Sequence, residues 1–93
     1  TMNNVISKKE LWTIVGYLEV SSARKKTIQS IGDEKYKLPS NICKETGLTS
    51  SQVSNALRDL KNKGLVICLN ESVSKGRLYK CTDLGLKILE KLK

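Results

Sequence analysis

The chain has 93 residues, 39% of them hydrophobic, and a formal net charge of +8 from 17 lysines and arginines against 9 acids. This length suits one domain, and the hydrophobic fraction is high enough for a folded core, which excludes a disordered chain. The basic excess favours a polyanionic partner, either a nucleic acid or an acidic membrane surface. Because every part of the chain is mildly basic, charge alone does not say which face meets that partner.

The sequence contains no histidine, and its three cysteines, Cys43, Cys68 and Cys81, form no C-x-x-C pair. A Cys–His nucleophile is therefore excluded, and a zinc site has too few ligands, so we expect no metal and no cofactor. With no phosphate-binding loop and no paired catalytic carboxylates, we do not expect an enzyme. Buried, reduced thiols are the expected state of the cysteines, because free cysteine packs as a small hydrophobe. A disulfide is the alternative for a hyperthermophilic source.

No apolar run approaches the roughly 20 residues that span a membrane. The first residues, TMNNVISKKE, also lack the apolar stretch of a signal peptide. We therefore expect a cytoplasmic, nucleoid-associated protein with no membrane partner. Thr1 precedes Met2, and we expect it to be an artificial addition.

Residues 7–20 have the pattern of an amphipathic helix. Its apolar side chains recur at i, i+3, i+4 and i+7: Leu11, Ile14, Val15 and Leu18. Ser7 and Glu10 suit a capping box at the start of this helix. Two serines then interrupt the pattern before a second helical stretch, which Gly32 ends. The sequence leaves open whether residues 7–31 form two helices or one bent rod.

The segment 39–64 has the pattern of a helix, a tight turn and a second helix, which is a helix-turn-helix. Pro39 suits the first turn of a helix, where its missing N–H is not needed. Gly47 suits the left-handed backbone that ends this helix. Thr49 and Gln52 predict a capping box at the start of the second helix. Its inward side chains again follow helical spacing: Val53, Ala56, Leu57 and Leu60.

The remaining residues indicate a hairpin followed by a helix. Residues 65–69 and 77–81 are rich in apolar side chains with a polar loop between them, so we expect a wing hairpin over 65–81. A final helix covers 82–92. The predicted fold class is mainly α with a small β-hairpin (α+β), with about five helices and a two- or three-stranded sheet. All of these elements belong to a single domain, 1–93.

The outward side of the second helix in 39–64 carries the residues that point to function. Small serines let a helix come close to a base pair, Asn55 can pair with adenine, and Arg58 can pair with guanine in the major groove. A merely solvated helix surface is the alternative, but the basic chain and the cationic hairpin loop favour DNA. The expected DNA-binding residues are Pro39, Ser40, Ser50, Ser51, Gln52, Ser54, Asn55, Arg58, Lys61, Asn62, Lys75 and Arg77.

Two stretches, LPSNICKETGLTSSQVSNALRDLKNKGLV and SKGRLYKCTDLG, carry a resemblance to a known family. They resemble the winged helix-turn-helix core of prokaryotic and archaeal transcription regulators of the MarR and ArsR type. The resemblance implies a sequence-specific transcription regulator that binds double-stranded DNA as a homodimer. It further implies a recognition helix, 50–63, in the major groove and a wing, 70–77, on the flanking backbone or minor groove.

The chain differs from these families in two features. It has no Cys/His/Asp cluster like the metal-sensing site of many ArsR proteins. We also expect its terminal helices to be shorter than the long dimerisation arms of typical MarR proteins. A dimer must therefore use residues 7–20 together with 84–92. The expected dimerisation residues are Leu11, Trp12, Ile14, Val15 and Leu18. The alternative is that this stripe only covers the core of its own domain.

Two other functions compete with DNA recognition. A winged helix can also serve as a protein–protein interaction module of a transcription or RNA-processing assembly, because one fold supports many functions. Double-stranded RNA fits the positive charge, but its A-form major groove does not admit a recognition helix.

Overall fold

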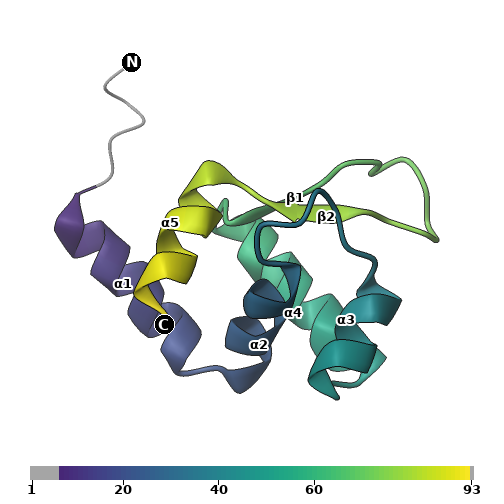
Figure 1. Cartoon of the computed structure of the whole chain (residues 1–93), viewed down its shortest axis with the longest axis horizontal. Coiled ribbons are helices and arrows are strands. Elements are labelled where there is room, and N and C mark those ends of the chain that lie inside the picture. Colours follow the sequence, from purple (N-terminus) through teal and green to yellow (C-terminus); the bar gives the residue numbers. More distant parts are fainter. Residues whose placement is uncertain (1–6, 93) are drawn as a thin grey trace.

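The computed structural model describes residues 7–92 as five helices and a two-stranded antiparallel sheet (Figure 1). The helices are α1 (Lys8–Glu19), α2 (Ser22–Ile31), α3 (Pro39–Thr46), α4 (Ser50–Asn62) and α5 (Asp83–Lys91). The strands are β1 (Val66–Cys68) and β2 (Tyr79–Cys81). This order confirms the predicted α+β class, in which a hairpin follows a helix-turn-helix. The interpretation of Thr1 concerns a residue outside the described part of the chain.

Local capping fixes the ends of the helices that matter most for the site. Both predicted capping boxes are present, one between Ser7 and Glu10 at the start of α1 and one between Thr49 and Gln52 at the start of α4. Each satisfies two N–H groups that would otherwise lack partners at a helix end. Gly47 ends α3 with φ +77°, a left-handed backbone that side chains with a β-carbon resist. The tight turn between α3 and α4 therefore follows from local sequence alone.

Helix α2 crosses the middle of the molecule and packs against the other four helices (Figure 1). The chain leaves α1 at Val20, and the Ser21 hydroxyl begins α2 by accepting a hydrogen bond from the backbone N–H of Arg24 at 3.3 Å. Residues 7–31 thus form two helices and not one bent rod. Ile28 and Ile31 of α2 are completely buried.

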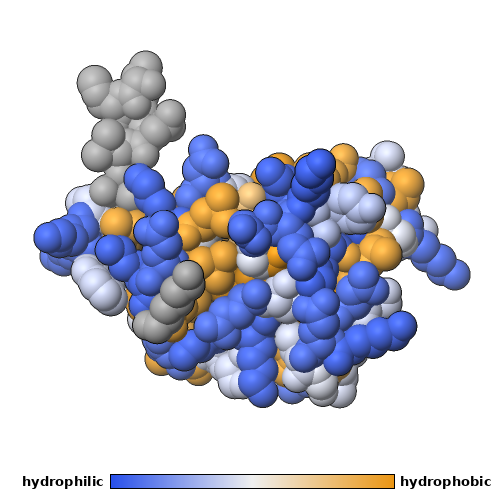
Figure 2. Space-filling view, viewed as in Figure 1, coloured by the Kyte–Doolittle hydropathy of each residue, from blue (hydrophilic) through white to orange (hydrophobic). Residues whose placement is uncertain are grey.

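The hydrophobic core takes side chains from all five helices and from both strands. α4 contributes the predicted stripe, Val53, Ala56, Leu57 and Leu60. Burying one such leucine or valine stabilises the fold by about 1.5–3 kcal/mol. Hydrophilic residues cover most of the surface seen in Figure 2, with hydrophobic ones between them near α5 and along the hairpin. None of the helices in residues 7–92 has the length and apolar character needed to cross a bilayer.

The small sheet lies over the helices with one face inward. β1 and β2 pair with Val66 opposite Cys81 and Cys68 opposite Tyr79, and these four side chains are buried, whereas Ile67 and Lys80 point outward. A third segment joins the edge of β2 through a single residue. The backbone of Lys37 exchanges two hydrogen bonds with that of Tyr79, at 2.8 and 3.0 Å. The predicted two or three strands are therefore two strands and one bridge.

The start of α5 is fixed against the beginning of β1. Thr82 donates its backbone N–H to the carbonyl oxygen of Leu65 at 3.0 Å, and its hydroxyl lies 2.6 Å from the carbonyl oxygen of Gly64. Gly85, one turn further on, is buried directly against Leu65. A β-carbon at position 85 would collide with the Leu65 carbonyl oxygen, so this close approach requires glycine.

We therefore expect Gly85→Ala to destabilise the protein by about 3 kcal/mol, because backbone atoms cannot move aside as a flexible side chain would. The matched control is Gly16→Ala in α1, where an added β-carbon meets nothing within 4 Å. That change should stabilise the fold by up to about 1 kcal/mol through helix propensity. Urea unfolding of the two variants measures both values. Equal effects of the two substitutions would contradict the proposed contact.

Candidate nucleic-acid interface

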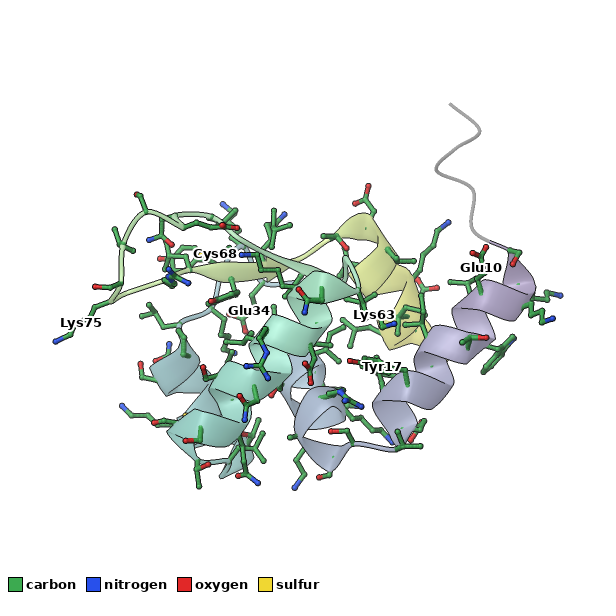
Figure 3. All side chains as sticks on the ribbon, turned by 180° about the vertical axis from the view of Figure 1, so that it is seen from behind. Glu10, Tyr17, Glu34, Lys63, Cys68 and Lys75 are labelled. Atoms are coloured by element: carbon green, nitrogen blue, oxygen red, sulfur yellow. The ribbon has the colours of Figure 1, made fainter. Side chains whose placement is uncertain are left out.

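Helix α4 lies at the surface with one buried side and one exposed side (Figure 3). The exposed residues are polar or cationic: Ser50, Ser51, Gln52, Ser54, Asn55, Arg58, Lys61 and Asn62. The Arg58 side chain is 67% exposed, and its contact with Asp59 is a loose 3.9 Å. Asp59, the acid of this helix, is turned toward α2 and half-buried. The predicted division of α4 into an inner and an outer side is confirmed.

The loop between β1 and β2 holds its shape through its own side chains. The Asn70 side-chain oxygen accepts the backbone N–H of Leu78 at 2.8 Å, and its nitrogen donates to the carbonyl oxygen of Gly76 at 3.1 Å. The Arg77 guanidinium donates to the carbonyl oxygens of Val73, at 2.7 Å, and of Glu71, at 3.2 Å. Arg77 is thus engaged within the loop and half-buried. The sequence predicted only a cationic loop with Lys75 and Arg77, because the pairing of Arg77 with carbonyl oxygens four and six residues earlier depends on how the loop folds.

A hollow of about 400 Å³ lies between α3, the start of α4 and the hairpin. It brings together five predicted residues: Pro39, Ser40, Ser50, Ser54 and Arg77. The other predicted residues lie outside it: Ser51, Gln52, Asn55, Arg58, Lys61, Asn62 and Lys75. Among these, Lys75 stands at the tip of the hairpin and points away from the molecule (Figure 3). The candidate surface therefore has three parts. These are this hollow, which forms a groove beside α4, the exposed side of α4, and the projecting Lys75.

Arg24 holds α4 against α1 and α2. Its guanidinium bonds the Asp59 carboxylate of α4 at 3.3 Å and the carbonyl oxygen of Tyr17 in α1 at 3.1 Å. The same group stacks over the Tyr17 ring at 3.9 Å, and Lys63, at the end of α4, lies 4.8 Å from that ring (Figure 3). A cation over an aromatic ring contributes about 0.5–2 kcal/mol. These contacts join residues distant in sequence, so no local pattern could have revealed them.

Lys37 holds α3 against the end of α2. Only 5% of this residue is exposed, and its ammonium lies 2.7 Å from Glu45 of α3 and 3.2 Å from Glu34. It also donates to the carbonyl oxygen of Ser30 at the end of α2, at 3.0 Å. A buried lysine is tolerated only with such partners. The hydrogen bond to Glu45 raises the pKa of Lys37 despite burial, and the same bond lowers the pKa of Glu45.

The three cysteines are free. Cys68 and Cys81 are buried as predicted, whereas Cys43 is only half-buried and borders the groove beside α4. Burial raises the pKa of the Cys81 thiol to about 11, so this group stays protonated and unreactive at neutral pH. Across residues 7–92, no three cysteine or acidic side chains gather in an arrangement that could hold a metal ion.

The predicted dimerisation residues divide into three groups by their exposure. Val15 and Leu18 are buried in the core of their own chain, at 6% and 0% exposure, so they cannot contact a second copy. Leu11 and Ile14 are half-buried against the same core. Trp12 is 53% exposed, with Lys91 of α5 at 5.9 Å from its ring. The apolar pattern of α1 is explained largely by the core, and Trp12 is its main outward apolar group.

No protein-family model matches this sequence, and no curated protein matches it either. Solved structures do match its fold. TubR from Bacillus thuringiensis serovar israelensis, bound to 24 bp of tubC, has a TM-score of 0.75 at 13% identity, over 94% of this chain and 92% of TubR. The oxidized form of MarR from E. coli has a TM-score of 0.66 at 24% identity, over 98% of this chain and 74% of MarR.

The fold is the winged helix of MarR. A third match is a point mutant of S. aureus MepR bound to an oligodeoxyribonucleotide, with a TM-score of 0.68 at 22% identity. It covers 91% of this chain but only 64% of MepR, so the chain spans less than two thirds of that protein. In winged-helix terms, α3 and α4 form the helix-turn-helix, and β1, β2 and their loop form the wing.

The Lys37–Glu45 pair predicts how stability depends on pH. Because the pKa of Glu45 is lowered from 4.5, the pair stabilises the fold above about that pH and is lost as pH falls through the lowered value. Because the pKa of Lys37 is raised from 10.5, the lysine contribution is complete below that pH and is lost only above it. We expect Glu45→Gln to lose less stability than the wild type between neutral and acidic pH.

Urea unfolding at a series of pH values measures this difference. Glu90→Gln is the matched control, since Glu90 is exposed on α5 and forms no ion pair within residues 7–92. In Glu90→Gln the free energy of unfolding should fall between neutral and acidic pH by as much as in the wild type. An equally large fall in Glu45→Gln would contradict the role of the pair.

Proposed function

We propose that this winged helix is a transcriptional regulator that binds double-stranded DNA sequence-specifically, with α4 in the major groove. One observation carries the proposal: the exposed side of α4 is polar and cationic, and its single acid, Asp59, is turned away and held by Arg24. On a helix that faces only solvent, acidic side chains on the outer side carry no penalty. On a helix that approaches a polyanion, acidic side chains on that side would repel the partner.

The chemistry of the exposed residues fits base recognition by the open side of α4 and phosphate contacts by the wing. Asn55 and Arg58 are exposed on the open side, where an asparagine can pair with adenine and an arginine with guanine. Ser50 and Ser51 are small, so the start of the helix can come close to the groove floor. Lys75, at the wing tip, suits a phosphate or a narrow minor groove. Arg77, engaged within the wing, supports the loop that presents Lys75.

The solved structures of similar fold support this proposal by analogy. TubR is described as bound to tubC, and the MepR mutant as bound to an oligodeoxyribonucleotide. At 13% and 22% identity, the shared property is the fold, and the DNA partner of this chain is our proposal. Such a protein acts where the chromosome is, so we place it in the cytoplasm with the nucleoid.

We also propose a homodimer that uses α1 and α5. Trp12 of α1, Val20 just after α1 and Leu86 of α5 are large hydrophobic side chains that remain exposed, and α1 packs beside α5. Hydrophobic residues are visible at the surface around α5 in Figure 2. Leu11 and Ile14 of α1 are half-buried against the core and would add apolar area to this surface. A dimer of this kind would bind two half-sites about one helical turn apart.

A protein-interaction module is the second candidate, and the outer face of the hairpin favours it. Ile67 and Leu69 of this hairpin and the neighbouring Tyr36 are exposed hydrophobic residues. Lys80 lies opposite Ile67 in the sheet, so the surface is apolar with a cation beside it. This candidate predicts that selection from random duplexes enriches no sequence and that DNA binding follows charge alone.

Arg58→Ala should cost about 1–3 kcal/mol of binding to the preferred duplex and relax the choice of one base pair. Lys75→Ala should instead weaken binding to all duplexes and flatten the dependence of log affinity on log salt by about one unit. Selection from random duplexes, followed by fluorescence anisotropy over a range of salt concentrations, separates the two effects. If both variants bind every duplex as the wild type does, α4 and the wing are not the DNA-binding surface.

Trp12→Asp should raise the dissociation constant of the homodimer at least about tenfold, because a buried aromatic anchor would become a charge. Tyr36→Asp is the matched control, since Tyr36 is equally exposed, at 54% against 53%, but adjoins the sheet. Sedimentation equilibrium of the two variants measures the change. Dissociation by Tyr36→Asp and not by Trp12→Asp would move the interface to the hairpin side.

A further inference from the structure

One acid lies on the candidate DNA surface and holds one of its cations. Glu71, at the start of the wing loop, pairs with Lys61 of α4 at 2.8 Å. The two side chains are 56% and 39% exposed, so the pair stands at the surface where an approaching molecule can compete for it. Their mutual hydrogen bond raises the pKa of Lys61 and lowers that of Glu71, so both are charged at neutral pH.

The position of Lys61 on α4 makes it a natural phosphate ligand. Ser50 and Ser54 border the groove between α4 and the wing, and Lys61 follows at i+11 and i+7 from them, on the same side of the helix. Arg58, also exposed on α4, has only the loose contact with Asp59, and Lys75 forms no ion pair within residues 7–92. Lys61 is therefore the exposed cation of α4 that already has a close anionic partner.

A phosphate that binds Lys61 must displace the Glu71 carboxylate or approach it as a like charge. Either event opposes binding, and by the same amount for every sequence, because the phosphate backbone is common to all duplexes. We infer that Glu71 is an internal competitor for DNA phosphate that lowers the affinity for all duplexes while leaving sequence preference unchanged. This inference rests on the proposed DNA-binding function and assigns a regulating residue to that surface.

Glu71→Gln tests the inference with little change to the wing. The substitution removes the charge but keeps the backbone carbonyl that accepts the Arg77 guanidinium at 3.2 Å. Relative to the wild type, we expect about threefold tighter binding at physiological salt, the scale of an exposed ion pair. The slope of log affinity against log salt should steepen by about one, since one more cation meets the DNA. The ratio of affinities for selected and random duplexes should stay unchanged.

Asp33→Asn, which makes the same change of net charge in the loop after α2, is the matched control, because Asp33 is exposed and forms no ion pair within residues 7–92. It should have a smaller effect. Lys61→Met completes the test: it should weaken binding more in the Glu71→Gln background than in the wild type, because Glu71 already withholds Lys61 in the wild type. Equal effects of Glu71→Gln and Asp33→Asn, or equal effects of Lys61→Met in both backgrounds, would overturn the inference while the proposed function stands. A wild-type chain that binds no duplex would overturn both.

Discussion

Burial of α2 at the centre of the molecule is the constraint on which the other elements depend. Its completely buried isoleucines, Ile28 and Ile31, touch the core that α3, α4 and α5 share. The two ends of α2 carry polar contacts instead: Arg24 reaches α1 and α4, and the carbonyl oxygen of Ser30 accepts the Lys37 ammonium that binds α3. In a domain this small, core burial alone leaves little margin. The Arg24–Asp59 ion pair at one end of α2 and the hydrogen bond from Lys37 to Ser30 at the other link α2 to the two helices of the helix-turn-helix.

The features that the sequence predicted correctly are those that a few neighbouring residues decide. Capping boxes at Ser7 and Thr49 and the left-handed backbone at Gly47 depend on groups within three residues. The outer side of α4 followed from helical spacing, because one apolar stripe fixes the opposite side. Together these local rules give the element order, the helix-turn-helix and most of the exposed candidate residues.

The features that the sequence missed depend on partners far apart along the chain. The local sequence does not single out Lys37, because neither the strand bridge to Tyr79 nor the partner Glu45 is visible in a local pattern. For Val15 and Leu18 the sequence left open a dimer interface or the core of the same chain, because which side of α1 is covered by α2 and α5 depends on tertiary packing. The dimer and the DNA contacts themselves remain predictions.

Net charge is a poor guide to how many cations face a partner in this protein. Of the 17 basic residues, several neutralise acids of the same chain, including Arg24, Lys25, Lys37 and Lys61. Arg77 is occupied by backbone carbonyls of the wing. The positive field of the candidate surface therefore comes from a few side chains whose positions the fold determines. Arg58 on α4 and Lys75 on the wing are two of them.

The Lys37 bridge links two parts of the molecule that would otherwise be separate. Its backbone is bonded to β2 at Tyr79, and its side chain is bonded to α3 at Glu45. Rocking of α3 relative to the hairpin would separate the buried Lys37 ammonium from the Glu45 carboxylate, so this contact opposes such a motion. A binder that needs no internal rearrangement forfeits little conformational entropy when it docks. Such a molecule would leave the bending and adjustment to the duplex, and its choice of sites would then reflect DNA stiffness as well as base identity.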